Sequence, residues 1–339
     1  MRINDPLVSI VVLNWNGKCF LSNCIDSLLT QDYPNYEVLL VDNGSSDGSL
    51  EFAQTRFGDN PKVRIIALGY NYGFSRGNNL GIKYAQGKYV IVLNNDTEVM
   101  PSFVAELVKV AEADETIGSV SCKILHYDGS VWFGQYFTHA GFIVPFFTQS
   151  LLKETLTELY DHFSLNLANS GCAVLYRKEL ISKIEGFDED FWSDWEDYDL
   201  GYRINLAGFK SVYIPIPLVL HVGGGSFGFP PERLVRMYRN MLLTYVKNYE
   251  LRNFVTRFPL FLFVLLPICH VGWLVHRLCF SLRAFDKRNG IWYFFSLMKA
   301  YIQFISKLKI FYAKRYKIMN LRKVSDKQIF LNTQLIGVL

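Results

Sequence analysis

The chain has 339 residues, of which half are hydrophobic, 16% are aromatic and 19% are charged. These values exclude a disulfide-stabilised mini-protein and a disordered chain, and the length suits one large domain with an appendage or two modest domains. The net charge of +4 conceals an asymmetry, because residues 283–327 carry 12 Lys/Arg and 2 Asp/Glu while the remainder is net acidic. A basic end of this kind suits nucleic acid or the anionic face of a membrane.

The six cysteines are scattered, without a CxxC pair or a Cys/His cluster of zinc spacing. Neither a disulfide framework nor a structural zinc is therefore expected. The apolar N-terminal stretch is interrupted within a few residues, which predicts a strand instead of a signal peptide. We expect the body of the protein to stay in the reducing cytoplasm.

The first 120 residues alternate short apolar runs with amphipathic stretches. Strands are predicted at 7–13, 36–41, 63–67 and 88–93, with helical patterns ending at 29, spanning 73–85 and following Pro101. This alternation predicts right-handed crossovers and a largely parallel sheet covered on both faces, which is an α/β fold. In such a sheet, ligands bind at the carboxyl ends of the strands.

The middle of the chain is less regular. Residues 118–176 are interpreted as extra strands and loops, including a strand-like run at 141–147 and a core strand at 169–176. A helix is predicted at 196–206, a strand at 212–221 and a helix at 232–249. The sequence Gly223–Gly228 between the last two satisfies GxGxxG, but no βαβ unit follows it, so we do not expect a dinucleotide site there.

The C-terminal third changes character. Phe258–His276 contains 19 residues without a formal charge, which at about 1.5 Å per residue could just cross a hydrocarbon core of about 30 Å. Apolar residues then recur at helical spacing over 291–308, with lysines mostly on the opposite side, as in a helix that lies in a membrane interface. We expect a single span or an interfacial segment around 258–282; the alternative is a helical appendage buried against the body.

Polar side chains follow three of the predicted strands, at the edge where ligands bind. They are Asn14 and Asn16, Asp42 and Asn43, and Asn94, Asn95 and Asp96. Asp96 supplies a hard oxygen ligand suited to Mg²⁺ or Mn²⁺ completed by phosphate oxygens and water. The alternatives are ordinary turn chemistry for Asn94–Asp96 and helix capping for the serines that follow Asp42.

Six motifs in one register now carry a resemblance. The runs VSIVVLNWNG, VDNGSSDGS, NYGFSRGNN, LNNDTEV, GFDEDFW followed by WEDYDLGYR, and HVGGGS resemble the inverting nucleotide-sugar glycosyltransferases of family 2, especially their rhamnosyltransferase-like members. The resemblance covers roughly residues 6–250. It implies a GT-A fold, in which a Rossmann-like nucleotide half continues into an acceptor half.

The resemblance also implies roles at the donor side. Asn14 and Asn16 match the loop that contacts the nucleotide, Asp42 matches the acid that recognises the base with Asn43 beside it, and Arg76 lies in the segment that closes over that base. Asn94, Asn95 and Asp96 occupy the family's DxD position, with Asp96 as metal ligand. Asn94 replaces the first Asp of that motif, which lowers the negative charge around the metal.

On the acceptor side, the resemblance implies that Asp197 is the catalytic base, and that His221 completes the metal site. Inverting transfer needs one base beside the acceptor hydroxyl and charge stabilisation at the leaving nucleoside diphosphate. Glu196 is interpreted as a group that orients the base or binds the acceptor. A retaining route would need a further nucleophile, which these residues do not exclude.

These observations predict a GT-A catalytic domain at 1–250 and a hydrophobic, basic helical membrane-associated region at 251–339. The expected partners are a nucleotide-sugar donor, a saccharide or polyprenyl-linked acceptor, and the cytoplasmic face of a membrane. One alternative is a non-catalytic, membrane-tethered protein that binds nucleotide sugars. Nucleic-acid binding by the basic end is the other alternative, which the many aromatic residues of that segment argue against.

Overall fold

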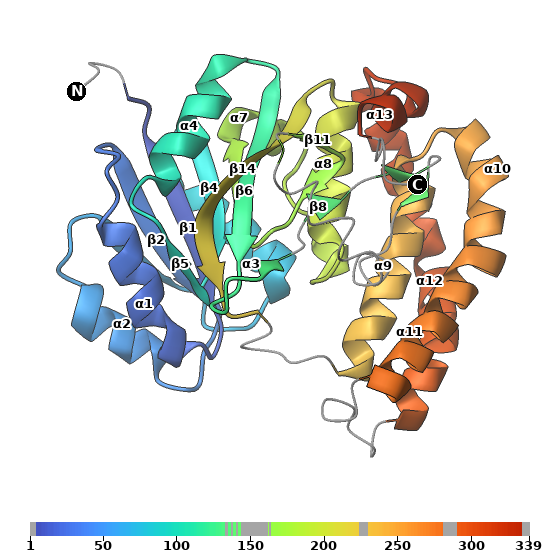
Figure 1. The fold of residues 1–339 in the computed structure, drawn as a ribbon, viewed down its shortest axis with the longest axis horizontal. Coiled ribbons are helices and arrows are strands. Elements are labelled where there is room, and N and C mark those ends of the chain that lie inside the picture. Colours follow the sequence, from blue (N-terminus) through green and yellow to red (C-terminus); the bar gives the residue numbers. More distant parts are fainter. Residues whose placement is uncertain are drawn as a thin grey trace.

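The computed structural model describes residues 5–132, 135–136, 138–139, 142–143, 162, 164–223, 230–280 and 290–333. A central sheet has helices on both faces, and a layer of C-terminal helices stands beside it (Figure 1). The strand order is β11-β14-β6-β13-β4-β1-β2-β3, with β5 paired to β14 and β7 paired to β6. These strands are β1 (Val8–Asn14), β2 (Tyr36–Asp42), β3 (Val63–Ala67), β4 (Tyr89–Asn94), β5 (Thr97–Val99), β6 (Ile117–Leu125), β7 (Val131–Trp132), β11 (Ser164–Asn166), β13 (Ala173–Arg177) and β14 (Lys210–His221).

Parallel pairing dominates the N-terminal half of the sheet, as predicted. β1 runs parallel to both β2 and β4, and β2 runs parallel to β3. β13, which lies outside those first 120 residues, inserts antiparallel between β4 and β6. The strand predicted at 169–176 is divided between β12 (Ala168–Asn169), which pairs with β8 (Gln135–Tyr136), and β13. Of the strand-like run at 141–147, the described residues form only β10 (Phe142–Ile143), which pairs with β9 (Thr138–His139).

Two apolar cores fill the spaces between the sheet and its helices. Along β1, Val8, Ile10 and Val12 belong to one core and Val11 to the other, as expected where successive side chains of a strand point to opposite faces. The first core includes side chains of α1, α2 and α4, and the second those of α3, α7 and α8. The bounds are α1 (Lys18–Leu29), α2 (Ser49–Phe57), α3 (Gly73–Tyr84), α4 (Phe103–Ala113), α7 (Lys178–Lys183), the 3₁₀ helix η1 (Glu189–Phe191) and α8 (Glu196–Leu206).

Helix α8 forms the wall between the sheet and the C-terminal helices. Leu200 and Ile204 pack toward the sheet, while Tyr198 and Tyr202 pack into the helical layer. Every residue of α8 is buried, and each large apolar side chain buried in this way contributes about 1.5–3 kcal/mol. Gly208, with φ +86°, follows its C-terminus. The helix that carries the predicted base is therefore held firmly from two sides.

The C-terminal helices share one apolar core with α8. They are α9 (Pro231–Asn248), α10 (Leu251–Leu260), the π-helical turn η2 (Phe261–Leu265), α11 (Leu266–Phe280), α12 (Gly290–Leu321) and α13 (Asp326–Asn332). Asp326 is fully buried and accepts hydrogen bonds from Tyr202 Oη at 3.0 Å and from the backbone N of Glu250 at 2.7 Å. Side chains from both sides of the predicted boundary at residue 250 thus pack together.

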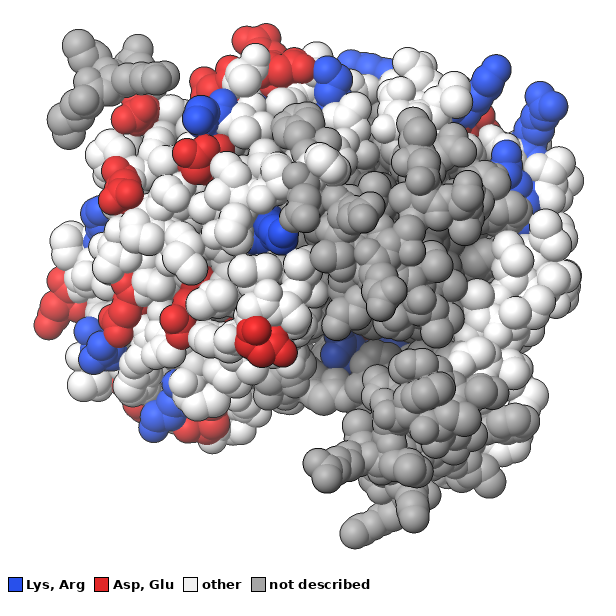
Figure 2. All heavy atoms as spheres, in the orientation of Figure 1, with Lys and Arg blue, Asp and Glu red and all other residues white. Residues whose placement is uncertain are grey.

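The outer surface of this layer is apolar. Leu251–Gly272 is a 22-residue candidate membrane span by length and composition, and 22% of its most apolar window is buried. Figure 2 shows charges of both signs over the sheet, whereas the right-hand side, over α10, is largely uncharged below a few Lys and Arg at its upper end. On α12, large exposed side chains recur at helical spacing: Trp292, Phe295, Met298, Ile302 and Ile305.

Candidate functional site

The ends of β1, β2 and β4 bring the predicted donor-side residues together. The strand register places Asn14 opposite Asp42, and Leu13 opposite Asn94. Asn95 Nδ2 donates to Asn14 Oδ1 at 2.7 Å, and Asn14 Nδ2 donates to Asp42 Oδ1 at 3.3 Å. All three of these side chains are more than nine-tenths buried. At this edge of the sheet, a chain of hydrogen bonds therefore links the side-chain amides of Asn95 and Asn14 to the Asp42 carboxylate.

Two loops close this polar edge. Asn16, with φ +49°, accepts a hydrogen bond from the backbone N of Ser46 at 2.7 Å through Oδ1. Ser45 Oγ accepts from the backbone N of Asn16 at 3.0 Å and from Asn14 Nδ2 at 3.1 Å. Ser45 thus takes part in the site itself, a role that its position in a capping sequence did not reveal.

Asn43 connects β2 to the start of α3. Its Oδ1 accepts from the backbone N of Tyr72 at 3.0 Å, and its Nδ2 donates to Asn71 Oδ1 at 3.1 Å. Arg76 on the first turns of α3 is half exposed, lies 4.5 Å from the ring centre of Tyr72 and 3.7 Å from the Glu189 carboxylate. The structure thus directs Arg76 toward η1 and Tyr72.

Asp96 and His221 meet at the neighbouring strand ends. β5 pairs antiparallel with β14, which places His221 opposite Thr97. His221 Nε2 lies 3.1 Å from Asp96 Oδ1, and both side chains are more than nine-tenths buried. Among the described residues His221 Nδ1 has no hydrogen-bond partner, and no group of three or more His, Cys, Asp and Glu side chains could hold a metal. The pair offers one carboxylate and one imidazole as possible metal ligands.

Asp197 reaches the same edge from α8. Its Oδ2 accepts a hydrogen bond from the backbone N of Gly171 at 2.9 Å. The carbonyl oxygen of Cys172, which follows Gly171, accepts from the backbone N of Asn94 at 2.9 Å. Complete burial raises the pKa of the Cys172 thiol well above its ordinary value, and the nearby Asp96 and Asp197 carboxylates raise it further. Asp197 therefore contacts the chain just before β13, which pairs with the end of β4 just before Asp96.

Glu196 is a buried acid beside Asp197. Its Oε2 finds no hydrogen-bond partner among the described residues. Burial raises the pKa of Glu196 well above its ordinary value, and the charges of Asp197 and Asp194 add to this effect. Such a perturbed acid at a sheet edge is typical of functional sites.

The segment that leads to Glu196 has an unusual backbone, which the sequence pattern did not predict. Trp192, Asp194 and Trp195 have φ values of 66°, 65° and 78°, a region that L residues occupy at a cost. Two arginines of α9 hold this segment, because Arg233 Nε and Arg236 Nη2 contact the Asp194 carboxylate at 2.7 and 2.9 Å. The aromatic rings have different environments: Trp195 is buried, while Trp192 lies 4.8 Å below the Arg236 guanidinium.

The glycine-rich loop after His221 lies mostly outside the described residues. Gly223, with φ +75°, is its described beginning, and a Cβ there would lie 2.8 Å from the Trp132 ring. Residues 224–228, which complete the GxGxxG pattern, are not described.

Comparison with known proteins identifies the family of this site. The model of Glycosyl transferase family 2 matches residues 9–184, more than half of the chain. The chain is 32% identical over 229 residues to the O-antigen biosynthesis protein RfbC of Myxococcus xanthus, covering 64% of this chain but 17% of that protein. It is 28% identical over 250 residues to the N-acetylglucosaminyl-diphospho-decaprenol L-rhamnosyltransferase of Mycobacterium tuberculosis, covering 66% of this chain and 79% of that protein.

The fold is also found in a solved structure. A mannosyltransferase from Pyrobaculum calidifontis, PcManGT, in complex with GDP-Man and Mn²⁺, superposes with a TM-score of 0.58 and 16% identity over 89% of this chain and 88% of that one. These matches confirm the family resemblance and the GT-A fold that the sequence motifs implied.

Proposed function

Since the chain belongs to glycosyl transferase family 2, we propose that it transfers a sugar from a nucleoside-diphosphate donor to a saccharide or polyprenyl-linked acceptor, with inversion. One observation carries the proposal: Asp197 Oδ2 accepts from the backbone N of Gly171 at 2.9 Å, and the adjoining Cys172 carbonyl accepts from the backbone N of Asn94, two residues before Asp96. An in-line displacement needs a base on one side of the sugar and charge stabilisation on the other. The two carboxylates supply groups suited to these two tasks.

On the donor side, the polar edge of the sheet would bind the nucleotide. The Asp42 carboxylate and the Asn14 amide are already oriented by each other and by Ser45. Prior orientation reduces the cost of ordering these groups when a ligand binds. Asn16 and Asn43 fix the two loops beside them through backbone contacts, which supports their assignment to the donor site.

The Asp96–His221 pair fits a divalent cation. Carboxylate oxygen and imidazole nitrogen are ligands that Mn²⁺ accepts, and Mg²⁺ binds through a few carboxylates together with phosphate oxygens and water. When bound, the cation would neutralise charge on the departing nucleoside diphosphate. Asn94, in place of an acid, leaves Asp96 as the carboxylate of the motif. The Mn²⁺ in the PcManGT complex supports a divalent ion in this fold.

On the acceptor side, Asp197 would accept the proton of the attacking hydroxyl. The backbone N groups of Gly171 and Tyr198 donate to its two oxygens at 2.9 and 2.7 Å, which fixes the orientation of the carboxylate. The raised pKa of Glu196 favours its protonated form, in which the side chain can donate a hydrogen bond. We assign Glu196 the role of orienting the acceptor hydroxyl or the base.

The apolar face of the C-terminal helices supports membrane association. Alternate sides of the candidate span are buried and exposed: Phe258 and Phe261 pack inward, while Phe263 and Ile268 are exposed. Tyr301 Oη of α12 donates to the carbonyl of Leu262 at 2.6 Å, which ties the two helices together. A helix packed along one side in this way favours an interfacial position over a span.

The same region supports our proposals for the acceptor and for the side of the membrane. A shallow cavity of about 200 Å³ opens between α9 and α12, lined by Val235, Trp292, Phe295 and Met298 among others. An apolar surface beside the site supports an acceptor that itself carries a lipid. The free cysteines of the described residues favour the reducing, cytoplasmic face.

A donor screen tests the proposed reaction. The purified full chain is incubated with UDP-, dTDP- and GDP-sugars and Mg²⁺ or Mn²⁺, and release of the nucleoside diphosphate is measured. We expect release with one nucleotide class and its loss on chelation, and an inverted anomeric configuration of the product by NMR. Donor binding without release, in the presence of saccharide and polyprenyl-linked acceptors, would instead support a non-catalytic binding protein.

Flotation with liposomes that contain anionic lipid tests the membrane surface. The double variant Ile302→Glu/Ile305→Glu places two negative charges on the exposed stripe of α12 and should lose most of its binding. Ile216→Glu, on β14, changes an exposed residue of the same kind and should float like the wild type. Equal flotation of both variants would contradict the assignment of this face, and extraction only by detergent would favour a span.

A further inference from the structure

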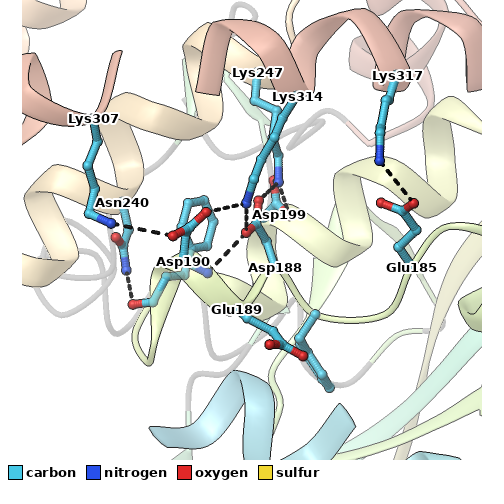
Figure 3. A network of polar contacts seen from close by, with 12 residues as sticks. Glu185, Asp188, Glu189, Asp190, Asp199, Asn240, Lys247, Lys307, Lys314 and Lys317 are labelled. Atoms are coloured by element: carbon cyan, nitrogen blue, oxygen red, sulfur yellow. Dashed lines mark hydrogen bonds and ion pairs between the residues drawn. The ribbon is translucent and has the colours of Figure 1, made fainter. Parts of the chain in front are cut away.

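A buried group of charges connects α8 to the C-terminal helices (Figure 3). Asp199 lies two residues after Asp197 and is fully buried. It accepts hydrogen bonds from Arg203 Nε at 2.9 Å, Lys247 Nζ at 2.8 Å and Asn248 Nδ2 at 2.8 Å. Because Lys247 and Asn248 belong to α9, the first turns of α8 are bound to α9 through charges that water does not reach.

The same charges extend to α12. Lys247 Nζ also contacts Asp188 Oδ2 at 2.7 Å, and the opposite oxygen of Asp188 accepts from Lys314 Nζ. Lys314 further contacts Asp190 Oδ2 at 2.6 Å, and Lys307 lies 3.5 Å from the other oxygen. Figure 3 shows Lys307 and Lys314 reaching from α12 to the two acids of one short segment. Helix α12, which carries exposed apolar side chains on its outer side, therefore contacts the catalytic half of the protein through Lys307 and Lys314.

The acids that α12 holds begin the segment that delivers the proposed base. Asp188 accepts from the backbone N of Asp190 and so caps η1. The chain then passes through Trp192, whose carbonyl accepts from the backbone N of Ser75 in α3 at 3.0 Å. It enters α8 only four residues later, directly at Glu196 and Asp197. A displacement of the acids at 188 and 190 therefore moves the chain immediately before the base.

The ion pair between Asp188 and Lys314 favours the charged form of both side chains. Burial would raise the pKa of Asp188, but the Lys247 and Lys314 ammonium groups outweigh it and hold the pKa well below its ordinary value. Lys314 shows the complementary effect, because the Asp188 and Asp190 carboxylates raise its pKa although burial lowers it. Removing one member of a buried charge cluster leaves an uncompensated charge, which favours movement of the remaining side chains.

We propose that Lys314 of α12, together with Lys247, is a positioning residue for the base Asp197. This inference rests on the proposed function. It makes the helix on the membrane side part of the catalytic machinery, so that Lys314 is needed for transfer even to a water-soluble acceptor with no membrane present. Replacing Lys314 should lower kcat and leave the donor KM nearly unchanged, because the donor contacts lie on other elements, at the ends of β1, β2 and β4.

The chain offers a matched control on the same helix. Lys317, three residues after Lys314, pairs with Glu185 at 3.4 Å with both side chains about 70% exposed. Exposed pairs of this kind contribute little to stability. Kinetics of purified full-length Lys314→Met, Lys314→Arg and Lys317→Met, with a water-soluble acceptor and no lipid, separate positioning from general charge effects.

The expected results are distinct for the three variants. Lys314→Met should lower kcat about ten- to hundredfold, the cost of a small misplacement of a catalytic group, with the donor KM nearly unchanged. Lys314→Arg should recover most of kcat because it keeps the charge, and Lys317→Met should behave as the wild type. An unchanged kcat in folded Lys314→Met, or an equal loss in Lys317→Met, would overturn the inference.

Hydrogen exchange supplies a readout that does not depend on turnover. Residues 188–197 should exchange faster in Lys314→Met than in Lys317→Met, while 8–14 should not change. Faster exchange together with a wild type that releases no nucleotide from any donor would leave the packing role standing and refute the proposed function. Should Lys314→Met fail to fold, Asp190→Asn removes the more exposed partner of Lys314 and should lower kcat in the same way; full activity of that variant would refute the inference.

Discussion

Replacing Gly17 by alanine should damage the donor side of the site without altering its charge. A Cβ at this position would lie 2.1 Å from Asn95 Nδ2 and 2.7 Å from Asn14 Oδ1, where ordinary contact begins at 3.4 Å. The backbone of Gly17, with φ −117°, accepts alanine, so the Asn95 amide must retreat by about 1.3 Å. Its 2.7 Å hydrogen bond to Asn14 cannot survive that displacement.

The size of the effect follows from that lost hydrogen bond. Leaving a buried amide unpaired costs about 1–3 kcal/mol. If about 1–2 kcal/mol of this falls on donor binding, the donor Kd rises about 5- to 30-fold. The assay is calorimetric titration with the donor that the screen identifies, for Gly17→Ala and for Gly272→Ala, where an added Cβ meets nothing within 4 Å. An unchanged Kd in well-folded Gly17→Ala would refute the assignment of this edge to the donor.

Two further changes test the acid beside the base and the docking of the C-terminal helices. The pKa of Glu196 is raised in the folded state, so folding binds protons and the stability of the protein falls as pH rises above the ordinary pKa of a Glu side chain. Glu196→Gln should therefore unfold at a higher urea concentration than the wild type at pH 8, and this difference should vanish near pH 4. A difference that does not change with pH would contradict this sign. Asp326→Ala removes one partner of Arg322 and the acceptor of Tyr202 Oη and of the Glu250 backbone N–H. It should lower the unfolding free energy by about 3–5 kcal/mol, against less than about 1 kcal/mol for exposed Glu185→Gln; equal urea midpoints for these two variants would show that the helices are not docked in this way.

Hydrophobic periodicity predicted much of the framework from the sequence. The strand at 63–67 and the helix at 196–206 have the predicted bounds, because β-branched runs and an acidic N-terminal turn mark them locally. The insertion of β13 between β4 and β6 was not predictable, since strand order depends on distant pairing. Such pairing leaves no periodic signal within the strand itself.

In the site, too, some contacts could be predicted from the sequence and others could not. The polar residues at strand ends could be predicted to meet, because parallel strands bring their carboxyl ends to one edge. The ion pairs of Asp194 with arginines and of Asp188 with lysines could not be predicted. They join segments about 40 to 126 residues apart, and in the sequence their charged residues resemble ordinary surface residues. Burial alone distinguishes Lys247, 2% exposed, from an ordinary lysine.

The most direct test of this account measures turnover and donor affinity on the same samples of wild type and Asp197→Asn. A general base contributes about 10²- to 10⁴-fold to a rate. We therefore expect Asp197→Asn to lose about that factor in kcat while its donor Kd stays within about twofold, because no base-side group contributes to donor binding. A variant that transfers sugar at the wild-type rate would contradict the account.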